Sequence, residues 1–136
     1  MEGLRYALSI AQESGGVLTV VHVAELLPED VPGFGEPDPS ADHPHTFRDY
    51  LAQAEAARAA QLDAAIPAGV REYCTVETVM ASGKPYREIL RLAAERASDV
   101  IVLGVHGRSA VDRFFFGSTT EHVARAATCP VLTIRR

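Results

Sequence analysis

The sequence contains no tryptophan, only two cysteines and no long hydrophobic run. Cys74 and Cys129 are far apart and form no CxxC or Cys/His spacing, so neither a zinc site nor a redox motif is expected. Both lie in or beside apolar stretches, which predicts buried thiols. Because no apolar run approaches the roughly 18–20 residues that a membrane span needs, and no secretory leader is visible, we expect a cytoplasmic protein without membrane contact.

An excess of basic residues is also absent, since the formal net charge of the 136 residues is −5. A nucleic-acid-binding domain is expected to be basic, so no nucleic-acid partner is expected. The charge is nevertheless uneven: residues 81–136 contain nine basic and five acidic side chains, whereas residues 1–45 contain one basic and eight acidic side chains. A small anion would be favoured by the C-terminal part, unless these are only scattered surface charges.

Helical and strand patterns alternate along the chain. The expected elements are a helix at Glu2–Ser14, a strand at Val17–Val23, a helix at Thr46–Ile66, a strand at Tyr73–Ala81, a helix from Pro85, a strand at Val100–Val105, a helix at Ser118–Ala127 and a strand at Pro130–Ile134. This order predicts a single α/β domain, residues 1–136, with a Rossmann-like, doubly wound parallel sheet and helices on both faces. The first strand is nearly all β-branched, which is typical of burial on both faces. Five prolines in residues 28–45 predict a long surface loop.

The stretch from Gly104 to Glu121 carries the clearest functional pattern. Gly104 and Gly107 end the strongest strand, where glycine permits positive φ and close approach of a ligand to the main chain. Ser118 opens a helix whose first N–H groups could hold a phosphate, and Arg108 is a nearby cation. The alternative is structural, because residues 118–121 fit a helix capping box and the glycines fit a turn. Neither a Walker A loop nor a GxGxxG fingerprint is present.

The spacing Gly104-x2-Gly107-x9-Gly117-Ser118, followed by CPVLTIRR, resembles the ATP-binding branch of the universal stress protein family. The similarity extends to LRYALSIA, VVHV and GKPYREILRLAAERASDVIVLGVHGRS, and it spans nearly the whole chain apart from the proline-rich loop. It implies an adenine-nucleotide α-hydrolase-like fold and an ATP site, with Mg²⁺ carried by the phosphates. The implied nucleotide-binding residues are Val23 at the adenine, Gly104 at the ribose, and Gly107, Gly117 and Ser118 at the phosphates, with Arg108 and Thr119 added by adjacency.

The sequence departs from the family pattern at its N-terminus. Members of the family begin with a strand that precedes the helix containing LRYAL and that carries an adenine-binding aspartate. Here the sequence starts inside that helix, so the first family strand is expected to be missing. Because that strand is central in the family sheet, its absence would leave two unpaired strand edges, beside Val17–Val23 and Val100–Val105.

The resemblance implies an adenine-nucleotide-binding regulatory protein of the stress response. No activated nucleophile or general base accompanies the glycine pattern, so we expect no catalytic residue and at most slow ATP hydrolysis. The family also implies a homodimer formed through Pro130–Ile134. A dimeric interaction module that does not bind nucleotide is the alternative, and the missing aspartate favours it. A third alternative, an enzyme of the α-hydrolase type, has no supporting catalytic constellation.

Overall fold

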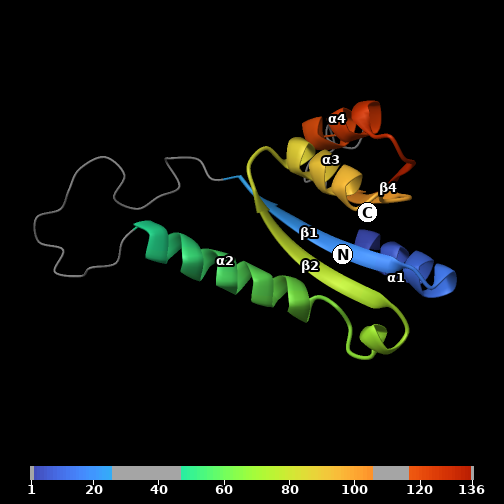
Figure 1. Cartoon of the computed structure of the whole chain (residues 1–136), viewed down its shortest axis with the longest axis horizontal. Coiled ribbons are helices and arrows are strands. Elements are labelled where there is room, and N and C mark those ends of the chain that lie inside the picture. The colour runs from blue at the N-terminus through green and yellow to red at the C-terminus, as the bar shows by residue number, and fades with distance from the viewer. Residues whose placement is uncertain (1, 26–46, 106–116, 136) are drawn as a thin grey trace, which may run out of the picture.

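The computed structural model describes residues 2–25, 47–105 and 117–135. Helices and strands alternate in them as α1 (Glu2–Ser14), β1 (Val17–Ala24), α2 (Phe47–Ala64), the short 3-10 helix η2 (Val70–Glu72), β2 (Thr75–Ser82), α3 (Pro85–Glu95), β3 (Ile101–Val105), α4 (Ser118–Ala126) and β4 (Val131–Arg135) (Figure 1). The α/β class with parallel strands, predicted from the sequence, is confirmed. The proline-rich loop expected at residues 28–45 lies outside the described residues.

The four described strands form two separate parallel pairs. β1 pairs with β2 from Val17–Thr75 to Ala24–Ser82, and β3 pairs with β4 from Ile101–Val131 to Val105–Arg135. The strand expected at Val17–Val23 is present as β1, which is the first strand of the described residues and follows α1. Within the described residues no ladder of hydrogen bonds joins β1 to β3, so the two pairs do not form one continuous sheet.

Helices connect the two strand pairs. α1 contacts β1 in one pair and both β3 and β4 in the other. α3 contacts β1 and β2, whereas α4 contacts β4, and the two helices pack side by side above the strands in Figure 1. α2 packs mainly on β2, and it extends away from the rest of the fold (Figure 1). None of the described helices is long and apolar enough to cross a membrane.

The main cluster of buried side chains lies between α1 and the first strand pair. Its buried members are Leu8 and Ala11 from α1, Ile66, Cys74 and Val76. Four partly buried residues pack against them, namely Leu4, Leu18, Val20 and Val70. The helical spacing of apolar residues in residues 2–14 therefore explains why α1 forms and which face it buries.

Two burial predictions require correction. The β1 strand is not buried on both faces: Ala24 is its one buried residue, and Val17 is 65% exposed. Among the described strands β1 pairs with β2 alone. Cys74 is buried as predicted, but Cys129, just before β4, is only partly buried.

Leu8→Ala should destabilise the protein, because Leu8 is 8% exposed and belongs to the main core cluster. The expected loss in free energy of unfolding is about 2–4 kcal/mol, measured by urea denaturation. Ile10→Ala is the matched control on the same helix, because Ile10 is 38% exposed, and it should cost less than about 1 kcal/mol. Equal losses for the two variants would contradict this location of the core.

Candidate functional site

The carboxyl end of β1 is joined to the start of α3. Val23 is half-buried near the end of β1 and is in register with Ala81 of β2. Directly after it, the carbonyl of Ala24 accepts a hydrogen bond of 3.1 Å from the N–H of Gly83. Gly83 has φ of 135°, a conformation that side chains rarely adopt, so glycine is needed for the turn that leads into α3. The end of β1 and the first turn of α3 are thereby held together.

Gly104 lies inside β3, in register with Ile134, and not in a turn. It is not among the described glycines with positive φ, so the expectation that its backbone needs positive φ is wrong. The other expectation, that glycine at this position lets a ligand approach the main chain, stays a prediction, but the backbone of Gly104 does lie close to that of α1. A Cβ at Gly3 would lie 3.2 Å from both the Cα and the N of Gly104, so the two backbones nearly touch.

The first turn of α4 is open to solvent. Gly117 is the N-cap residue, with φ of −56°, and a Cβ at this position would meet no atom of the described residues within 4 Å. Ser118 is exposed and Thr119 is half-buried, whereas Thr120 behind them is 8% exposed. The first N–H groups of a helix have no partner within it and carry a partial positive charge. This turn therefore presents hydrogen-bond donors and hydroxyl groups that an anion can reach.

The capping-box interpretation of residues 118–121 is not supported. Ser118 is the first helical residue and not the N-cap, which is Gly117. Glu121 does not reach back to the N-cap but forms an ion pair of 2.7 Å with Arg125, one turn further along α4. The structural explanation for Ser118 is thus removed, and its side chain is left on the exposed start of the helix.

The seven sequence-predicted site residues fall on separate elements. Val23 belongs to β1, Gly104 to β3, and Gly117, Ser118 and Thr119 to the start of α4. The remaining two, Gly107 and Arg108, lie outside the described residues.

Sequence reasoning missed a contact between α3 and α4. The rings of Tyr86 and His122 are stacked, with centroids 4.6 Å apart and planes 25° apart. The Nδ1–H of His122 donates a hydrogen bond of 2.6 Å to the carbonyl of Ser118. Arg87 lies over the Tyr86 ring, with its guanidinium carbon 5.8 Å from the ring centroid. The spacing of four residues between Ser118 and His122 was the only sequence signal, while Tyr86 resembled an ordinary buried helix residue.

Glu88, in the first turn of α3, is held as a carboxylate. The hydrogen bond from Arg91 to Glu88, at 2.6 Å, lowers the pKa of the Glu88 carboxyl, so it stays ionised and is a weak base. No group of three or more His, Cys, Asp or Glu residues in residues 2–25, 47–105 and 117–135 is arranged to hold a metal ion.

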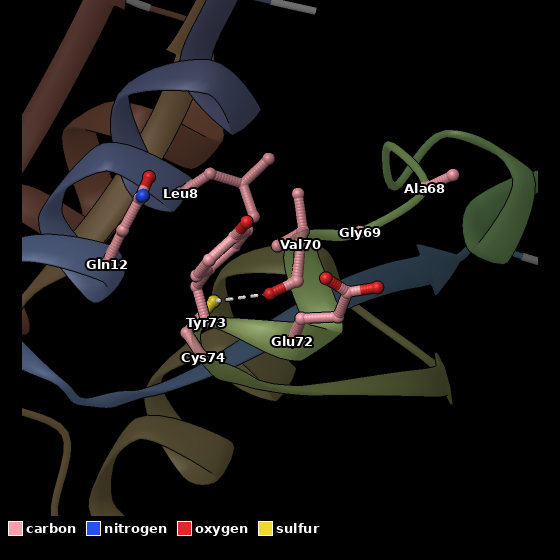
Figure 2. A pocket seen from close by; sticks show the side chains of 8 residues that line it. All are labelled: Leu8, Gln12, Ala68, Gly69, Val70, Glu72, Tyr73 and Cys74. Carbon is pink, nitrogen blue, oxygen red and sulfur yellow. Dashed lines mark hydrogen bonds between the residues drawn. The ribbon is translucent and has the colours of Figure 1, made fainter.

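A separate hollow of about 300 Å³ lies at the opposite end of the strands. Figure 2 shows its lining by Leu8 and Gln12 of α1 and by the segment that precedes β2, which contributes Ala68, Gly69, Val70, Glu72, Tyr73 and Cys74. Among these residues, the Cys74 thiol donates a hydrogen bond of 3.6 Å to the carbonyl of Val70 (Figure 2). Ligands of parallel α/β folds bind at the carboxyl ends of strands, so this hollow is not the candidate site.

Comparison with known proteins matches this chain to one protein family. The family model described as "Universal stress protein family" matches residues 1–135. The "Universal stress protein in QAH/OAS sulfhydrylase 3'region" of Thermus aquaticus is 34% identical over 125 residues, which is 92% of this chain and 82% of that protein. The universal stress protein YxiE of Bacillus subtilis is 41% identical over 59 residues, which is 43% of this chain and 40% of that protein.

Solved structures agree with this family. The universal stress protein UspA from Lactobacillus plantarum superposes with a TM-score of 0.70 at 27% identity, covering 98% of this chain and 88% of that one. A universal stress protein in complex with cAMP matches with a TM-score of 0.56 over 98% of this chain and 86% of that one. One from Archaeoglobus fulgidus in complex with dAMP matches with 0.54 over 97% and 84%. Both are 22% identical to this chain, so they show a shared fold.

Proposed function

The chain belongs to the universal stress protein family, and we propose that it is a regulatory protein that binds ATP or another adenine nucleotide. The adenine would lie at Val23, the ribose at Gly104 and the phosphates at the start of α4. Relatives of the same fold that were solved with cAMP and dAMP support an adenine nucleotide as the ligand class. The chain spans 82% of its Thermus aquaticus relative.

The observation that carries the proposal is the open first turn of α4. Gly117 leaves space where any other residue would place a Cβ, and Ser118 is exposed beside it. A phosphate at this position would accept hydrogen bonds from the N–H groups of the first turn and from the Ser118 hydroxyl. Thr119, Gly107 and Arg108 complete the proposed phosphate-binding set. The excess of basic over acidic residues in residues 81–136 also favours a negatively charged ligand.

Magnesium would accompany ATP through the phosphates and not through a protein cage. Mg²⁺ keeps several waters and is commonly held by one or two protein groups together with substrate phosphates. In the sequence, no activated nucleophile or general base accompanies the glycine pattern. We therefore propose regulation through nucleotide binding, with ATP hydrolysis slow at most.

A second proposal concerns self-association through β4. Among the described strands β4 pairs only with β3, so its other edge has no described strand partner, and Leu132 of β4 is 38% exposed. Unpaired strand edges are templates for pairing with a second chain. We propose that residues 130–134 form the contact of a homodimer. Such a dimer is compatible with nucleotide binding, and it is also the basis of the alternative function, an interaction module that binds no nucleotide.

Gly117→Val tests the phosphate position. The backbone conformation at Gly117 suits any residue and a Cβ there meets no neighbour among the described residues, so the free energy of unfolding should fall by no more than about 1 kcal/mol. The affinity for Mg·ATP in titration calorimetry should fall by about tenfold or more, because the side chain occupies the place of the phosphate. Arg125→Ala, on the exposed face of the same helix, should bind as the wild type does. Unchanged affinity in the Gly117→Val variant would refute this site.

Leu132→Lys tests the dimer. A charge on the exposed edge of β4 should shift the sedimentation-velocity profile from dimer towards monomer, because a lysine on a strand edge opposes pairing. Ile10→Lys is the matched control, since Ile10 on α1 is also 38% exposed. A wild-type profile that is monomeric at micromolar concentration would refute the proposal, and so would equal effects of the two lysines.

A further inference from the structure

The proposed nucleotide site is divided between the two strand pairs. Val23 is on the pair formed by β1 and β2, whereas Gly104 and α4 belong with the pair formed by β3 and β4. No strand pairing joins these halves within the described residues. The distance between the adenine end and the phosphate end of the site is therefore set by helix packing, through α1 and through the contact between α3 and α4.

α3 is held to the β1–β2 pair by hydrogen bonds near both of its ends. At its start, the N–H of Gly83 donates to the Ala24 carbonyl at 3.1 Å. Just past its end, the guanidinium of Arg96 donates to the Thr19 hydroxyl of β1 at 3.3 Å and to the Glu77 carboxylate of β2. The helix therefore moves with β1 and β2, and Tyr86 in its first turn has a fixed position relative to Val23.

α4 packs against β4 of the β3–β4 pair and contacts α3 through His122. Val123 on α4 is fully buried, and the helix contacts β4. The neighbouring His122 stacks on Tyr86 of α3 while its Nδ1–H donates to the Ser118 carbonyl at 2.6 Å. One imidazole thus contacts both the helix that is fixed to the adenine half and the residue that begins the phosphate-binding turn.

We propose that Tyr86 and His122 are positioning residues that set the spacing between the adenine and phosphate halves of the site. This inference rests on the proposed function. A ligand that engages both halves gains affinity only if the second half is held where the bound first half can reach it. A ligand that engages one half alone gains nothing from that spacing. The stacked pair therefore acts on the affinity for the whole nucleotide and not on either end separately.

The test compares ATP with adenosine, which lacks the phosphates. In Tyr86→Ala and His122→Ala, the dissociation constant for Mg·ATP should rise about tenfold, because the two halves no longer hold a fixed spacing. The dissociation constant for adenosine, measured by NMR titration at millimolar concentration, should stay within about twofold of the wild type. Tyr86→Phe keeps the stacked ring and should restore the wild-type affinity for ATP.

Controls separate positioning from general damage. Arg125→Ala, one turn further along α4, should leave both affinities unchanged. The His122 side chain is exposed, so His122→Ala keeps the test open even if Tyr86→Ala lowers the unfolding midpoint. Wild-type affinity for ATP in both alanine variants overturns the inference and leaves the proposed function standing. An equal loss of ATP and adenosine affinity also overturns it, since that outcome indicates a general loosening. A wild-type chain that binds neither ligand refutes the proposed function itself.

Discussion

The helix packing that joins two separate pairs of parallel strands is the constraint on which the rest of this structure depends. Hydrogen bonds hold β1 to β2 and β3 to β4, but within the described residues no ladder continues from one pair to the other. Parallel strands are normally buried between neighbours on both sides and helices on both faces. Here β1 lacks one neighbour, and its apolar side chains are accordingly half-buried. α1, α3 and α4 supply the packing that fixes the two pairs relative to each other.

The division of the strands into two pairs changes what fixes the geometry of the candidate site. In a continuous sheet, the carboxyl ends of adjacent strands keep a fixed spacing through their hydrogen bonds. In this chain the close contact of Gly3 with Gly104 and the stack of Tyr86 on His122 take over that role. Such helix contacts are side-chain dependent, so single substitutions far from a ligand can change the geometry of its site. The chain therefore has the fold of its family, while the geometry of its candidate site depends on a few identifiable residues.

Much of the fold could be predicted from the sequence, because local patterns determine local structure. The spacing of apolar residues in residues 2–14 and the β-branched run from Val17 predicted α1 and β1 with correct starting points. Pro85 marked the start of α3 correctly, since its missing N–H has no helical partner. The errors arose where tertiary contacts decide. Gly104 proved to be a point of helix–strand contact, and Ser118 proved to be the first helical residue and not the cap.

The sequence by itself determined the order of helices and strands, the α/β class and the glycine–serine pattern that resembles the universal stress protein family. Each of these is a property of neighbouring residues or of fixed spacings along the chain. Only the tertiary structure decided that the strands form two pairs, that the first turn of α4 is open to solvent, and that His122 links α3 to Ser118. Those features join residues far apart in the chain, such as Tyr86 and His122, and no local pattern encodes such a contact.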